Sequence, residues 1–182
     1  MALLIAGSLL LGCSRETASL PEWSPGERVT VPGVLVAVLR ESEETTLFRV
    51  TGEFSDDFEQ YKTKPKVGGH PAIAEKSLPP KAAREVAEIL SSGANYLPAN
   101  EAWTCLPQPF YLIRARRGAD VLEVVVHECG DVEMAGTIGG KRHSWQHGLG
   151  SSAGEERLWA ILRSVIPSAP NCCGETADTA KN

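Results

Sequence analysis

Residues 103–135, WTCLPQPFYLIRARRGADVLEVVVHECGDVEMA, decide the fold, because they read as a β-hairpin with a cysteine near each open end. Two runs rich in Tyr, Ile, Leu and Val flank a turn at residues 117–120. Gly118 fits the first central position of a type II′ turn, which requires a positive φ. Pairing outward from this turn predicts a core face and a mixed face. On the core face the opposed residues are Tyr111 and Val126, Ile113 and Val124, and Ala115 and Leu122, and on the mixed face Arg114 is opposite Glu123.

Two further strands are predicted before this hairpin. Residues 34–40 carry apolar side chains at both odd and even positions, which is typical of a strand covered on both faces. Residues 45–51 predict the next strand, and the acidic turn at 41–44 would join the two as a second hairpin. Residues 52–71 mix scattered aromatics with Gly, Pro and charge, and this mixture indicates an irregular surface segment.

Two amphipathic helices complete the pattern. Apolar residues recur at helical spacing over residues 79–92, with Ser77 as the expected N-cap, and over residues 153–166, where Ser152 and Glu155 resemble a capping box. Strands and helices are segregated along the chain. The sequence therefore predicts an α+β fold, with a mostly antiparallel sheet and two helices packed on one face.

Length and charge narrow the class of protein. A chain of 182 residues with 42% hydrophobic content can bury the core of one domain. The formal net charge of −5 argues against a nucleic-acid-binding surface and against a polybasic membrane patch. The basic cluster Arg114, Arg116 and Arg117 is followed by acidic residues, so cross-strand charge pairing is the expected role for it.

The N-terminal residues predict where in the cell the protein is located. Residues 1–13, MALLIAGSLLLGC, form an apolar run of signal-peptide length, too short to span a bilayer as a helix. Leu10-Leu11-Gly12-Cys13 resembles the lipobox of bacterial lipoproteins, although no Lys or Arg precedes the apolar run and Leu11 is bulkier than is usual in that family. The resemblance implies cleavage before Cys13, which would then be lipidated and acylated. Two or more acyl chains give stable membrane anchoring.

The resemblance also implies a division of the chain. Residues 1–12 would be a signal peptide. Residues 13–27 would comprise the lipidated Cys13 and a flexible, Pro-containing polar tether. Residues 28–170 would form the globular α+β domain, and residues 171–182 a Cys-containing flexible tail. An ordinary cleaved signal peptide and a buried N-terminal helix are the alternatives for the first segment.

The cysteines indicate disulfides. Without Cys13, an even number remains in a chain that the N-terminus directs to an oxidising compartment: Cys105, Cys129, Cys172 and Cys173. The hairpin register favours a Cys105–Cys129 pair, which closes a loop of roughly 25 residues and would contribute about 3 kcal/mol through lost chain entropy. Cys172 and Cys173 could pair with each other, or each could tether the tail to the hairpin, and the sequence leaves these connectivities open.

A metal or thiol site is the competing interpretation of the same region. His127 and Cys129 would lie on one strand face with Cys105 nearby, and these soft ligands could hold Zn²⁺ or Cu(I). The sequence offers no CxxC pair and no fourth ligand at a recognisable spacing. A Cys129 nucleophile activated by His127 is weaker still, because neighbours two apart on a strand seldom have attack geometry.

Residues 136–154 form a Gly-rich segment that predicts a solvent loop, with a binding lid as the alternative. His143 and His147 are four apart, which would place both imidazoles on one side of a short helix and could bind a metal. Ser144 stands where the zinc-protease motif needs Glu, so that motif is incomplete.

The sequence favours a binding or interaction module over an enzyme, because no complete catalytic signature is recognised in it. The arrangement of Cys105, Pro107, Arg114, Gly118 and Cys129 resembles the hairpin of some uncharacterised secreted bacterial proteins, a resemblance that implies no activity. The expected protein is a lipid-anchored envelope protein facing the periplasm or exterior. Its partners would be the membrane and an envelope protein or small ligand, with no nucleic acid and no cofactor.

Overall fold

The computed structural model describes residues 29–55, 57–97, 108–128, 130–150 and 153–167. Within them one sheet has the strand order β2-β3-β1-β4-β5-β6-β7, and every pairing is antiparallel. The strands are β1 (Glu44–Val50), β2 (Lys66–Val67), β3 (His70–Ser77), β4 (Pro109–Arg117), β5 (Asp120–His127), β6 (Asp131–Ile138) and β7 (Lys141–Gly148). The helices are α1 (Gly33–Arg40), α2 (Phe58–Tyr61), α3 (Pro80–Ser91) and α4 (Ala153–Val165), with a 3₁₀ turn, η1, at Gly93–Asn95.

The β4–β5 hairpin has the predicted register. Tyr111 is opposite Val126 and Arg114 is opposite Glu123, and the other predicted pairs also match. Gly118 has a φ of +56°, and no described residue other than glycine has a positive φ, so Ala119 has the negative φ that the second central position of a type II′ turn requires. The prediction of the central hairpin is therefore confirmed.

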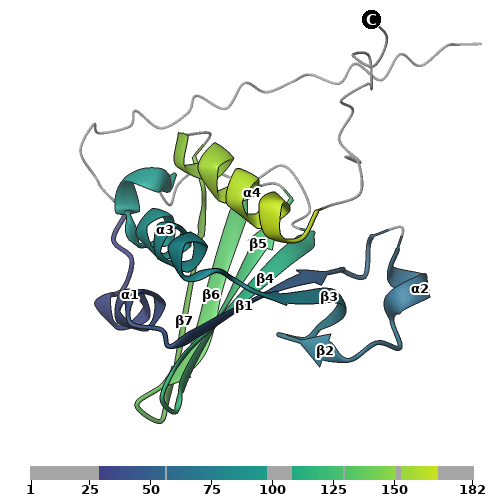
Figure 1. Ribbon diagram of the computed structural model, residues 1–182, viewed down its shortest axis with the longest axis horizontal. Coiled ribbons are helices and arrows are strands. Elements are labelled where there is room, and N and C mark those ends of the chain that lie inside the picture. The colour runs from purple at the N-terminus through teal and green to yellow at the C-terminus, as the bar shows by residue number, and fades with distance from the viewer. Residues whose placement is uncertain (1–28, 56, 98–107, 129, 151–152, 168–182) are drawn as a thin grey trace, which may run out of the picture.

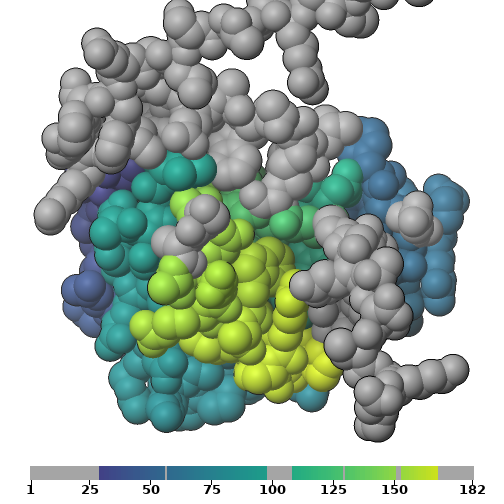
Figure 2. All heavy atoms as spheres, turned by 90° about the horizontal axis from the view of Figure 1, so that it is seen from above, coloured from purple at the N-terminus to yellow at the C-terminus, as the bar shows by residue number. Residues whose placement is uncertain are grey.

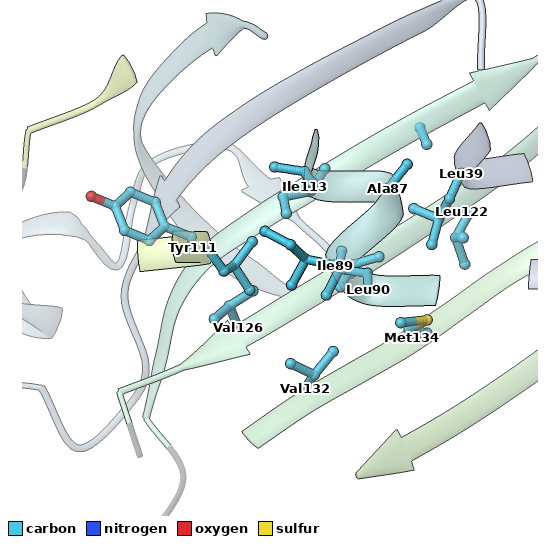
Figure 3. Packing of buried hydrophobic residues seen from close by; sticks show 14 of the residues in the cluster. Leu39, Ala87, Ile89, Leu90, Tyr111, Ile113, Leu122, Val126, Val132 and Met134 are labelled. Atoms are coloured by element: carbon cyan, nitrogen blue, oxygen red, sulfur yellow. The ribbon is translucent and has the colours of Figure 1, made fainter. Parts of the chain in front are cut away.

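The main core joins helices and sheet (Figure 1). It combines buried residues of α1, α3 and α4 with side chains from every second position of β4, β5 and β6. Figure 3 shows Leu39 of α1 and Leu90 of α3 close to Ile113, Leu122 and Met134 of the strands. Helices α3 and α4 also contact each other and lie side by side at the surface in Figure 2.

Residues 34–40 are helical, so the strand predicted there, and the hairpin that it would form with residues 45–51, are wrong. The buried residues of α1 are Leu35, Val38 and Leu39, which have the i, i+3, i+4 spacing of one helix face. The high content of β-branched residues indicated a strand, but packing of this stripe against α3, β4 and β5 outweighs the intrinsic preference. Residues 44–50 do form β1, as predicted.

Two segments predicted as irregular contain regular structure. Residues 52–71 include α2, β2 and the start of β3. Residues 136–154 include most of the β6–β7 hairpin, whose turn, Gly139-Gly140, has positive φ at both positions, as in a type I′ turn. The glycines that indicated a loop are therefore the tip of a hairpin.

Both predicted helices are present as α3 and α4, with ends within two residues of those predicted. The predicted Ser77 cap is wrong, because Ser77 is the last residue of β3 and Pro79 occupies the N-cap of α3 without a side-chain hydrogen bond. The prediction of an α+β fold with a mostly antiparallel sheet is confirmed, but the described residues contain four α-helices rather than two.

Candidate binding face

A second apolar cluster lies on the sheet face opposite the main core. Because side chains alternate along a strand, Leu112 points away from the core face that its neighbours Tyr111 and Ile113 line. Leu112 packs instead with Val125 and Phe48 of the flanking strands. We call this side of the sheet the second face, and its buried cluster consists of Phe48, Val50, Val67, Leu112 and Val125, with Ala72 packed against it.

The second face carries paired charges beside this cluster. Arg114 Nη2 lies 2.6 Å from Glu123 Oε1, and Nε of the same guanidinium lies 3.0 Å from that oxygen. The Arg114 Cζ also lies 5.3 Å from the centre of the Phe48 ring, within cation–π range. The sequence predicted this charge pairing across the β4–β5 hairpin, and the structure confirms it.

His127 is at the end of β5, on the second face. It follows Glu123 and Val125 at alternate positions of the strand, and only 6% of its surface is exposed. Its Nε2 is 4.0 Å from Oε2 of Glu133, a residue that β6 places opposite Val125. The buried imidazole of His127 therefore lies beside the carboxylate of Glu133.

His70 brings a second imidazole to this group. Burial lowers the pKa of His70 below its ordinary value, and the neighbouring His127 lowers it further. Glu133 and Glu123 oppose the shift, and Lys66 adds to it. One histidine and two carboxylates, from strands β5 and β6, thus act on His70 of β3 at one place on the second face.

Buried polar atoms occur where β1 ends and β4 begins. Thr51 Oγ1 and Gln108 Oε1 are inaccessible to solvent and have no hydrogen-bond partner among the described residues. The two residues lie near each other in the fold, because a Cβ added at Gly52, next to Thr51, would be 2.8 Å from Gln108 Oε1. A buried hydroxyl and a buried carbonyl oxygen thus lie where β1 ends and β4 begins.

Of the cysteines and the histidine that the sequence proposed for lipidation, disulfides or a metal and thiol site, His127 alone lies among the described residues. Cys13, Cys105, Cys129, Cys172 and Cys173 lie outside them, so the lipidation and disulfide predictions stay predictions. The described part of the chain contains no group of three His, Cys, Asp or Glu side chains arranged to hold a metal. The metal and thiol interpretation of Cys105, His127 and Cys129 likewise stays a prediction.

His143 and His147 lie in strand β7 rather than in a helix, so the predicted helical arrangement is wrong. Their side chains flank Trp145 on one side of the strand, and the ring of His147 lies 4.7 Å from that of Trp145. Trp145 in turn meets Tyr96 edge to face, with a centroid distance of 4.7 Å. Packing against aromatic residues thus accounts for this end of β7.

His70 and Glu133 were not found from the sequence. The signal for His70 was the dipeptide Gly68-Gly69 between Val67 and His70, which is a hairpin turn pattern within the segment predicted to be irregular. No local pattern marks Glu133, because pairing of β5 with β6 brings it to the site.

Comparison with protein-family models, with curated proteins and with solved structures finds no match for this chain. Among the described residues, no helix is long and apolar enough to cross a membrane.

Proposed function

We propose that this protein is a lipid-anchored lipoprotein of the bacterial envelope, facing the periplasm or exterior, whose α+β domain binds an envelope protein or a small ligand without catalysing a reaction. The observation that carries the proposal is Leu10-Leu11-Gly12-Cys13 at the end of an apolar run. The polar, Pro-containing residues that follow Cys13 suit a tether between an anchor and a domain. Anchoring by acyl chains on Cys13 needs no membrane-spanning helix.

Export to an oxidising compartment would give the remaining cysteines a structural role. The proposal pairs Cys105 with Cys129, near the open end of the β4–β5 hairpin, and leaves Cys172 and Cys173 as a possible second disulfide. The confirmed register of that hairpin supports this pairing, because it brings Pro109 opposite His127, and these residues lie close in sequence to the two cysteines.

The second face is the proposed binding surface. In this proposal α3 and α4 pack on the core face, and the single cluster that they form with β4, β5 and β6 supports that arrangement. The second face then meets solvent over β6 and β7, where Glu133, Ser144 and Gln146 are exposed. Imidazoles and carboxylates beside an apolar cluster are the mixture that ligand sites use for orientation and affinity.

The test is the intact mass of the full-length gene product, expressed in a bacterial host, extracted with detergent and measured with and without reductant. We expect a chain that begins at Cys13, carries acyl chains and gains mass on reduction as its disulfides open. A Cys13→Ser variant is the matched control, and it should carry no lipid.

A retained N-terminus without lipid would overturn the anchored-lipoprotein proposal. If the cysteines were also free and metal were bound, the metal or thiol-redox role of Cys105, His127 and Cys129 would replace it. The two outcomes differ in both lipid and thiol content, so one set of spectra separates them.

A further inference from the structure

The β2–β3 hairpin crosses the second face instead of extending the sheet sideways. In the strand order, β2 is three strand spacings from β4, which is about 14 Å in a flat sheet. A Cβ added at Gly68, in the β2–β3 turn, would nevertheless lie 2.5 Å from Leu112 Cδ1 on β4 and 3.2 Å from Glu123 Oε2 on β5. The hairpin must therefore fold over the face to bring its turn onto these strands.

A β-bulge explains how the hairpin turns. In the pairing of β1 with β3, Arg49 is opposite Ala74 and Val50 is opposite Ala72, so Ile73 is the extra residue. A bulge bends its strand and increases the local twist. Consistent with the bend, Ala74 packs on the main core whereas Ala72 packs on the second cluster.

The hairpin covers the apolar part of the second face. Val67 is the only residue of β2 that packs in the second cluster, and 9% of its surface is exposed. Beneath it, Phe48, Leu112 and Val125 are 4%, 0% and 7% exposed. Side chains on the outer face of a sheet reach such values only when another segment lies over them.

β3 pairs with β1 up to the bulge, but few interactions hold the part of the hairpin beyond it. β2 pairs with β3 through Lys66 with Pro71 and Val67 with His70, and proline has no N–H to donate. The Ala72 N–H donates to the Pro65 carbonyl over 2.9 Å, and the turn residues Gly68 and Gly69 are exposed. The Thr51 N–H at the end of β1 donates to the Pro71 carbonyl over 3.2 Å. The rest of the hairpin beyond the bulge is held by Val67 and by the contact of the turn with Leu112. In Figure 1, β2 and α2 lie together at one side of the sheet.

We propose that the β2–β3 hairpin is a flap that occupies the apolar part of the second face and opens to uncover Phe48, Leu112 and Val125. The flap is a self-blocking contact, because a ligand of that surface must displace Val67. The role of the flap as a gate rests on the proposed function, but its opening does not, since it requires neither lipid nor ligand.

Hydrogen exchange in the intact full-length protein tests the flap. The reporter is the amide of Thr51, which donates to the Pro71 carbonyl over 3.2 Å and so joins the end of β1 to the hairpin, and the reference amides are those of Val124 and Val126 in β5. We expect the Thr51 amide to exchange at least about a hundredfold faster than the reference amides, through a local opening that denaturant barely accelerates. Exchange of Thr51 at the rate of β5, through global unfolding only, would show that the hairpin is part of the rigid core and would overturn the proposal.

Gly68→Ala and Gly69→Ala form a matched pair. Both glycines have a positive φ, +57° and +87°, so both substitutions strain the backbone, but an added Cβ meets a neighbour only at Gly68. Gly68→Ala should accelerate exchange of the Thr51 amide at least about tenfold more than Gly69→Ala and leave β5 unchanged. Equal effects of the two substitutions would contradict the contact with Leu112.

If Gly68→Ala fails to fold, Val67→Ala tests the opening of the flap in its place. This variant removes the inserted side chain without adding a clash. It should increase both the exchange of the Thr51 amide and the binding of an apolar fluorescent dye, whereas Lys66→Ala should change neither. No increase with Val67→Ala would overturn the proposal. Because these measurements do not involve Cys13, failure of the flap and failure of the lipid anchor give separate results.

Discussion

His70 shows how a single residue can link the flap to acidity. It begins β3, directly after the Gly68-Gly69 turn, and is half-buried beside the second face. Burial is the main cause that lowers the pKa of His70, and the neighbouring His127 is the next. The closed hairpin thus favours the neutral imidazole, although Glu133 and Glu123 partly compensate for the cost of protonating it.

This shift predicts that the protein loses stability at acidic pH. The folded pKa is lower than the unfolded value, so the unfolded chain binds more protons below neutrality. The contribution of His70 is complete above the unfolded pKa of about 6.5 and is lost as the pH falls through the folded pKa. Urea unfolding should therefore give a smaller decrease in the free energy of unfolding between pH 7.5 and 5 for His70→Gln than for the wild type.

His143→Gln, in strand β7, is the control for this measurement, because it removes a histidine of the same sheet away from the flap. It should keep the pH dependence of the wild type. An identical slope in wild type and His70→Gln would show that another group is responsible.

The elements differ in how far local sequence determines them. The β4–β5 hairpin could be predicted because its alternation and the turn at Gly118 both indicate the same register. α1 could not, because Val34, Val36 and Val38 indicate a strand while the buried stripe of Leu35, Val38 and Leu39 indicates a helix. Only contact with α3, β4 and β5 decides between them.

The residues of the candidate site also differ in how far local sequence identifies them. His127 was identified from the sequence because it lies in a strand whose register is set locally. His70 reaches the site through the bulge at Ile73 and the folding of the flap, and Glu133 through the pairing of β6 with β5. Such long-range arrangements leave no periodic pattern near the residue itself.

The helical conformation of α1 predicts different effects for two identical substitutions. Val38 is fully buried, whereas Val36 is partly exposed and packs at the edge of the main core. Val38→Ala should reduce the free energy of unfolding by about 2 kcal/mol through lost apolar contact. Val36→Ala should cost less than half as much, because the higher helix propensity of alanine offsets part of the loss.

Denaturant unfolding of the two variants under the same conditions measures the difference. In a strand, positions 36 and 38 would share one face, and the two substitutions would have similar effects. Equal losses of stability would therefore favour the strand that the sequence indicated and contradict the helix.

At the scale of the whole molecule, one sheet supports two layers of apolar packing. The main core extends in sequence from Val31 to Ile166, and the second cluster occupies the opposite face of β1, β4 and β5. The domain boundaries predicted from the sequence, at residues 28 and 170, enclose both clusters. The tail predicted at residues 171–182 lies outside the described residues, so a role of its cysteines in holding the domain has to be tested on the protein.

Removal of residues 171–182 from the exported protein tests whether Cys172 and Cys173 hold the domain. If Cys105 pairs with Cys129, as we propose, the shortened chain keeps that disulfide, and its free energy of unfolding should stay within about 0.5 kcal/mol of the full-length value. If instead Cys172 and Cys173 tether the tail to Cys105 and Cys129, the shortened chain loses both disulfides, exposes free thiols and should lose about 2–5 kcal/mol. Urea unfolding with a thiol count on the same samples separates the two cases.

The full-length double variant Cys172→Ser, Cys173→Ser is the control, because it removes the thiols and keeps the tail. A loss of stability on truncation that this variant does not reproduce would mean that the tail acts through contacts other than disulfides.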